Sequence, residues 1–102
     1  MLHIASEASW HHAQRLGRYS LPGGVIHGCS LGQLRMVVAA HFPSLEGFVV
    51  LTIDESQALG EVRWVTYTQG GRSEAFPHLH GSCPVSAVSR VEPLARALAS
   101  SK

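Results

Sequence analysis

The stretch LPGGVIHGCSLGQL, from Leu21 to Leu34, holds a turn, the end of a strand and the start of a helix in direct succession. Proline followed by two glycines predicts the turn, and the apolar Val-Ile pair after it is typical of a strand. Ser30 and Gln33 fit a capping box, in which each side chain bonds the backbone N–H of the other residue. A helix is therefore expected from Ser30 to Phe42, since Pro43 cannot continue it.

The remaining chain has one further helix signal and several strand-like segments. Ser6 is a suitable N-cap and Gly17 a suitable stop, which predicts a helix between them. The expected strands and extended pieces, in chain order, are Met1–Ala5, Phe48–Ile53, Glu61–Thr68, Phe76–Gly81 and Val85–Val91. Pro93 then precedes a short Ala-rich tail. This order predicts one α+β domain over residues 1–102, with two helices in the N-terminal half and a mostly antiparallel sheet.

Composition excludes several classes of protein. A chain of 102 residues with a formal net charge of +1 has no basic stripe, so nucleic-acid binding is not expected. No window has the apolar length of a membrane span, and the polar N-terminus does not resemble a signal peptide. We therefore expect a cytoplasmic protein that binds neither nucleic acid nor membrane. Its two cysteines, Cys29 and Cys83, are predicted to be free thiols.

Seven histidines are many for this length, and four of them fall on or beside predicted strands. These are His3, His27, His78 and His80, which we consider as one potential cluster. His27 and Cys29 lie two residues apart where a strand meets a helix N-terminus. The positive end of a helix stabilises a thiolate, so Cys29 is a candidate nucleophile and His27 its candidate base. The alternative is that Cys29 is a small buried apolar residue and His27 a hydrogen-bonded strand residue.

The pair His78-Leu79-His80 directs both imidazoles to one side if the segment is a strand. With Cys83 nearby a metal site is conceivable, but no paired ligand spacing supports it. A titratable pair for proton transfer or hydrogen bonding is the favoured interpretation, and no metal site is predicted. Glu74, which precedes this segment, is a candidate to orient His78. Asp54 ends a strand and is expected to make a turn hydrogen bond.

Taken together, these segments resemble a known family. The order LHI, Trp10, Tyr19, GVIHGCSLGQL, FVVLTID, RW and FPHLHG is similar to the bacterial family called domain of unknown function 952 (DUF952) over nearly the whole chain. That resemblance implies an ADP-ribosyltransferase-like fold, a split antiparallel sheet around a cleft that holds NAD in related enzymes. It also implies that the cofactor-binding residues are His3, Tyr19, His27 and Ser30.

The chain departs from the family pattern at four positions. Gly28, Cys29 and His80 replace other residues, and Val65 stands where the family has an acid after Trp64. A carboxylate commonly stabilises the charge that develops in ADP-ribosyl transfer, and valine cannot do so.

Three hypotheses follow from the residues and the resemblance. The first is an enzyme or enzyme-like domain that binds NAD, ADP-ribose or a related nucleotide in a histidine-lined pocket, with ADP-ribosyl transfer as the activity that the resemblance implies. The second is a small-molecule tailoring enzyme without NAD that uses His27, Cys29 and His80. The third is a non-catalytic binding or structural module. The candidate catalytic residues are His3, His27, Cys29, His78 and His80. Convergence of the four histidines on one open pocket would favour the first two hypotheses, and dispersal would favour the third. The sequence makes no prediction of the oligomeric state.

Overall fold

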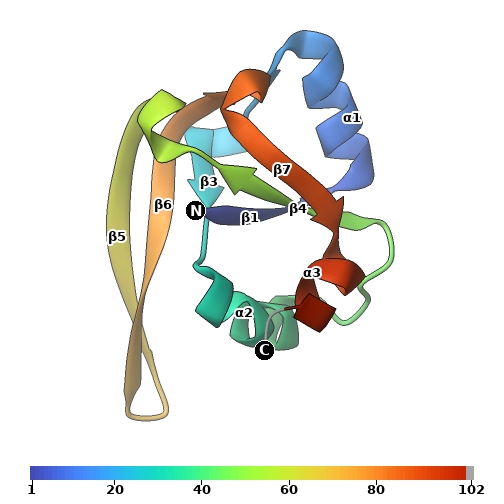
Figure 1. Ribbon diagram of the computed structural model, residues 1–102. Helices are drawn as coiled ribbons and strands as arrows, with labels where there is room; N and C mark the ends of the chain where they lie inside the picture. Colours follow the sequence, from blue (N-terminus) through green and yellow to red (C-terminus); the bar gives the residue numbers. More distant parts are fainter. Residues whose placement is uncertain (101–102) are drawn as a thin grey trace.

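The computed structural model describes residues 1–100 as three helices and seven strands (Figure 1). The helices are α1 (Glu7–Leu16), α2 (Leu34–His41) and α3 (Leu94–Ser100). The strands are β1 (Leu2–Ser6), β2 (Arg18–Tyr19), β3 (Val25–His27), β4 (Phe48–Ile53), β5 (Leu59–Gln69), β6 (Arg72–Pro84) and β7 (Val88–Pro93). This is the α+β architecture predicted from the sequence. No helix within residues 1–100 is long and apolar enough to cross a membrane.

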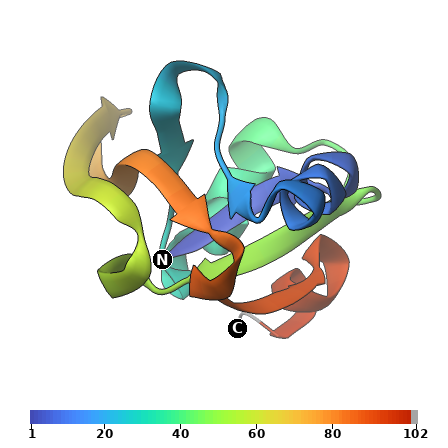
Figure 2. The same ribbon diagram turned by 90° about the horizontal axis from the view of Figure 1, so that it is seen from above.

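The strands form two antiparallel sheets. One sheet has the order β1-β4-β7. In the other, the long strand β6 pairs with β5 over most of its length, with β3 near its middle and with β2 at its C-terminal end. Seen from above, the β5–β6 hairpin and α1 lie on opposite sides of the molecule (Figure 2). A short bridge between Leu2 and Cys29 connects the sheets, with N–H···O distances of 2.8 and 2.9 Å.

Helix α1 begins and ends where its sequence predicts. The Ser6 side chain accepts a hydrogen bond from the backbone N–H of Ser9 at 3.1 Å. Gly17 adopts a left-handed conformation with φ 85°, and its N–H donates to the carbonyl of Ala13. Such a C-cap is favourable for glycine because it has no Cβ.

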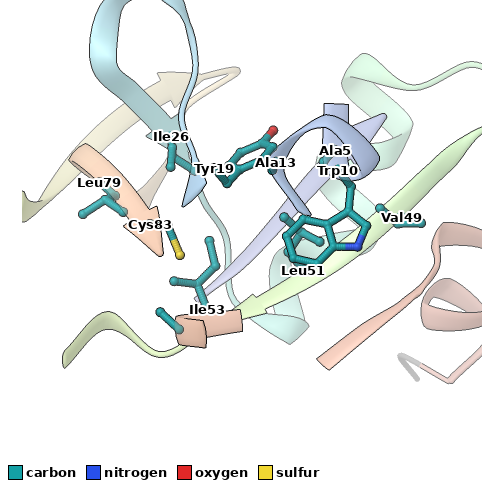
Figure 3. Packing of buried hydrophobic residues seen from close by; sticks show 11 residues of the cluster. Ala5, Trp10, Ala13, Tyr19, Ile26, Val49, Leu51, Ile53, Leu79 and Cys83 are labelled. Atoms are coloured by element: carbon teal, nitrogen blue, oxygen red, sulfur yellow. The ribbon is translucent and has the colours of Figure 1, made fainter. Parts of the chain in front are cut away.

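Strand β4 is apolar from Phe48 to Leu51 because both of its faces contribute to the core. Val49, Leu51 and Ile53 belong to a core cluster that also contains Trp10 of α1; Leu51 and Val49 lie beside Trp10, and Ile53 lies toward Cys83 (Figure 3). Val50 points the other way and packs in a second cluster. That cluster joins α2 and α3 through Leu34, Val38, Leu94 and Ala97. Alternate residues of a strand face opposite sides, so a continuous apolar run serves two cores at once.

Three features differ from the sequence predictions. The Ala-rich tail after Pro93 is helix α3, which buries Leu94 and Ala97. The helix expected from Ser30 begins as a 3₁₀ turn at Leu31–Gln33, and α2 proper starts at Leu34. The separate piece Phe76–Gly81 is the middle of the much longer strand β6, which follows a tight turn at Gly70 and Gly71.

Candidate ligand-binding cleft

A cleft of about 770 Å³ lies between the β5–β6 hairpin and helix α2. Its apolar lining includes Met36, Val37 and Ala40 of α2. Its polar and aromatic lining comes mainly from the strands and includes His3, His27, Tyr67, Arg72, Glu74 and His78. Clefts of this size, apolar over much of their wall with a few polar groups, are typical of small-molecule sites.

Strand alternation explains how β6 supplies most of the polar wall. Four residues of β6 that line the cleft occupy every second position of the strand: Arg72, Glu74, Phe76 and His78. Side chains at this spacing share one face of a strand. Tyr67 of β5 is directly opposite Glu74 in the ladder and lines the same cleft.

His27 and His78 form the centre of the polar wall. They are directly opposite each other in the β3–β6 ladder, and their rings meet edge to face with centroids 4.5 Å apart. The Tyr67 hydroxyl lies 3.4 Å from Nε2 of His78. Burial lowers the pKa of His78, and His27 and then His80 lower it further by charge repulsion. His78 is therefore neutral at pH 7, with one ring nitrogen able to donate and one to accept.

His3 lines the cleft from β1, but both of its ring nitrogens are bonded within the protein. Nδ1 lies 2.7 Å from the carbonyl oxygen of His27, and Nε2 lies 2.8 Å from the Tyr19 hydroxyl. A carbonyl can only accept, so Nδ1 carries the proton and the neutral ring accepts the Tyr19 hydroxyl at Nε2. Burial is the largest effect on the pKa of His3 and lowers it, against the raising effect of the His27 carbonyl. His3 thus holds His27 in place.

Tyr19 does not line the cleft, contrary to the expectation of a cofactor contact. It is only 2% exposed, and its hydroxyl donates to His3. Burial raises the pKa of Tyr19 to about 12, so it remains a neutral donor. Tyr19 supports the site from behind His3.

The expectation of an activated Cys29 is wrong. Cys29 is 3% exposed and packs with Leu34 and Val38 of α2. Burial raises the pKa of its thiol to about 11, although the amino terminus partly opposes this shift. The helix begins beyond Cys29, after the 3₁₀ turn at Leu31–Gln33, so the thiol gains little from a helix N-terminus. Both cysteines are free, as predicted, and both are buried, which for Cys29 is the alternative stated from the sequence.

Cys29 lines the cleft despite its burial, whereas two further predicted residues, His80 and Ser30, lie outside it like Tyr19. His80 is opposite Val25, two residues beyond His78 on β6, and is not among the lining residues. Ser30 lines a smaller pocket of about 320 Å³ beside Trp64. The structure therefore brings three of the four clustered histidines together on one cleft. Among residues 1–100, no group of three or more His, Cys, Asp or Glu side chains is placed to hold a metal ion.

Glu74 makes a different contact from the one expected. Its Oε1 accepts a hydrogen bond from Nε2 of Gln33 at 2.9 Å, and the structure gives no bond between Glu74 and His78 within the described residues. Val65 is opposite Phe76 in the ladder, on the same face as Tyr67, and brings no charge there. Among the described residues that line the cleft, Glu74 is thus the one that carries a carboxylate.

Sequence reasoning missed Tyr67, Arg72 and Phe76, and it gave Glu74 only the role of orienting His78. The available signal was the spacing of Arg72, Glu74 and Phe76 in register with His78. That signal depends on extending strand β6 back to Arg72, whereas the sequence predicts an extended piece only from Phe76.

Comparisons with known proteins give one family and one solved relative. A family described as "Protein of unknown function (DUF952)" matches residues 4–91. The crystal structure of protein CC0527 from Caulobacter crescentus, a structural genomics target, is 28% identical. It superposes with a TM-score of 0.73 over 89% of this chain and 82% of that one. A double mutant of CC0527 matches equally well. None of the curated proteins matches.

Proposed function

We propose that this chain, which belongs to the DUF952 family of proteins of unknown function, binds NAD, ADP-ribose or a related nucleotide in the cleft. The observation that carries the proposal is the ring pair of His27 and His78, 4.5 Å apart, inside a cleft of about 770 Å³. A nucleotide has groups that suit each part of this lining. The resemblance to ADP-ribosyltransferases supports the same ligand class.

The lining divides into surfaces of different chemistry. Met36, Val37 and Phe76 offer apolar contact for a flat base. Arg72 offers a permanent positive charge for a phosphate. His27, His78 and Tyr67 offer donors and acceptors for the ribose and amide groups of the ligand. Such a mixed surface suits a molecule that is aromatic, anionic and hydroxylated at once.

The proposed activity at this site is ADP-ribosyl transfer. The bond between the ribose and nicotinamide of NAD would break, nicotinamide would leave, and the ribose carbon would form a bond to a nucleophile of the acceptor or to water, whose proton would pass to a base. His78 is neutral and buried and can hold a proton at one ring nitrogen while accepting at the other. His27 is exposed at the cleft surface, and its position is fixed by the bond between its carbonyl and His3.

Calorimetry with NAD and with ADP-ribose tests the proposal. We expect saturable binding of at least one ligand and a raised melting temperature in its presence. In His27→Ala the binding should be lost, while the melting temperature of the free protein changes little because this side chain is exposed. His12→Ala is the matched control, since His12 is exposed on α1.

No heat and no melting shift with either ligand would contradict the proposal. Release of nicotinamide from NAD, abolished in His27→Ala, would support transfer or hydrolysis. Binding without turnover would leave a non-catalytic binding module. The hypothesis of a tailoring enzyme with a Cys29 nucleophile is disfavoured by the raised pKa of this buried thiol.

A further inference from the structure

We infer that Glu74 binds the sugar hydroxyls of the ligand and that Gln33 is the residue that positions it. This inference rests on the proposed function, because it specifies which groups of a nucleotide meet which part of the cleft. It is carried by the contacts of Gln33 and Glu74 and by the distribution of charge along the lining.

Gln33 is a buried side chain whose polar atoms are all engaged. Its Oε1 accepts from the backbone N–H of Ser30 at 3.0 Å. Its Nε2 donates to the carbonyl of Ala75 at 2.7 Å and to Oε1 of Glu74 at 2.9 Å. The amide is fixed from both the helix entrance and strand β6, so the carboxylate that it holds has a defined orientation.

Gln33 leaves Glu74 with capacity for a ligand. Oε2 of Glu74 accepts no hydrogen bond from any residue between 1 and 100, and Glu74 lines the cleft. An ionised carboxylate only accepts hydrogen bonds. The ligand must therefore present donors to this position.

The surrounding charge distinguishes hydroxyl donors from a cationic ligand. Arg72 lines the cleft two residues from Glu74 on the same face of β6. The permanent positive charge of Arg72 opposes a bound cation at this position. Neutral hydroxyls meet no such opposition, and a carboxylate accepts from them in strong, charge-assisted hydrogen bonds. The pairing of Glu74 with Arg72 thus suits a sugar phosphate.

The test compares ADP-ribose, ADP and dideoxy-ADP by calorimetry on the full chain. ADP lacks the terminal ribose, and dideoxy-ADP also lacks the hydroxyls of the adenosine ribose. For the unmodified protein we expect one of two comparisons to show a loss of affinity of roughly tenfold to a hundredfold. Either ADP binds more weakly than ADP-ribose, or dideoxy-ADP binds more weakly than ADP. In Glu74→Gln, ADP-ribose should bind that much more weakly, and the preference for the hydroxylated ligand should shrink to about twofold or less.

Gln33→Leu should reduce the same preference without removing the carboxylate. Because this change leaves two backbone groups unpaired, its folding is checked by its thermal melt, and Glu74→Gln serves as the second variant. Glu61→Gln is the matched control, since Glu61 is exposed on the neighbouring strand and pairs with Arg63. It should keep both the affinity and the preference.

The outcomes separate this inference from the proposed function. If the unmodified protein binds ADP-ribose and Glu74→Gln keeps the full hydroxyl preference, the inference is overturned and the proposed function stands. If Glu74→Gln binds NAD, which has a cationic nicotinamide ring, more weakly but ADP-ribose equally well, Glu74 recognises positive charge and the inference is also overturned. If the unmodified protein binds neither NAD nor ADP-ribose, both fail together.

Discussion

His3 is a buried side chain that joins three strands. From β1 it donates to the backbone of β3 at His27 and accepts from Tyr19 of β2. A buried imidazole needs partners at both nitrogens, because an unpaired polar group in the interior costs free energy. The exposed His27 ring therefore depends on His3 for its position, although His3 itself has no nitrogen left for a ligand.

The depressed pKa of His3 gives the stability of the protein a pH dependence. In the folded chain the pKa of His3 and that of His78 lie below their ordinary value of 6.5. As the pH falls below that value, the unfolded chain takes up protons that the folded chain does not, so folding stability decreases. We expect a lower melting temperature near pH 5.5 than near pH 7.5.

His3→Asn tests the origin of this dependence. Its amide can still donate to the His27 carbonyl but cannot titrate, so the difference in melting temperature between the two pH values should shrink. His11→Asn, at an exposed site on α1, is the control and should keep the full difference. Asp54, whose pKa is lowered from 3.8 by hydrogen bonds from Ser56 and Gln57, titrates below this window. An unchanged pH dependence in His3→Asn would refute the assignment.

At the scale of elements, Gly60 and Gly81 bring β5 and β6 into close contact. They are direct partners in the ladder, with φ angles of 148° and 150°. A Cβ on Gly60 would overlap the carbonyl of His80, and one on Gly81 would overlap the carbonyl of Leu59. Gly81 lies three residues from His78, so the close contact of the two glycines fixes the end of the hairpin opposite the turn, next to the cleft wall.

We expect Gly81→Ala to destabilise the protein strongly. The substitution combines a backbone conformation that favours glycine with a clash against backbone atoms, for a cost of roughly 2–5 kcal/mol. Gly32→Ala is the control, because the nearest atom to a Cβ there is Ser30 Oγ at 4.0 Å. Urea denaturation of both variants measures the difference. Equal free energies of unfolding of the two variants would show that β5 and β6 can move apart here to accept a Cβ without loss of stability.

The elements that were predictable are those with local signals. Helix α1 has a capping serine and a terminal glycine, and β4 has an uninterrupted apolar run. Helix α3 was missed because seven residues form a helix only when Leu94 and Ala97 find a core to pack against. Strand β6 extends beyond the predicted piece Phe76–Gly81 at both ends, because Gly81 lies inside the strand and the residues from Arg72 onward pair with β5.

At the scale of the whole molecule, β4 unites the two cores. Alternate residues of this strand enter the cluster with Trp10 and the cluster with Leu34. Neither cluster can lose its packing without exposing one face of the same strand. The domain should therefore unfold in a single cooperative transition.

This expectation is measurable with one fluorescent reporter. The chain has two tryptophans, the buried Trp10 and the exposed Trp64, so Trp64→Phe leaves Trp10 to report on the first core. Its fluorescence and the far-ultraviolet circular dichroism should give coincident urea transitions. Transitions that separate would show that the core under α2 and α3 unfolds independently.

The candidate site could be predicted only in part because it is assembled by long-range pairing. His27 and His78 were both singled out from local patterns, and the β3–β6 ladder then brings them together. Glu74 and Gln33 are 41 residues apart, and neither has a local signal that anticipates their contact. The buried position of Cys29 likewise depends on α2, which folds back over it.

Because side chains alternate along β6, only residues an even number of positions from His78 face the cleft. Arg72, Glu74, Phe76 and His78 line the cleft because each is an even number of residues from the next. An insertion of one residue between Arg72 and His78 would turn the residues on one side of it to the opposite face, even though every side chain were retained. Two inserted residues would restore the facing. Within this hairpin, changes in length that preserve the wall therefore occur in even steps, or in the turn at Gly70 and Gly71, where the strand register is untouched.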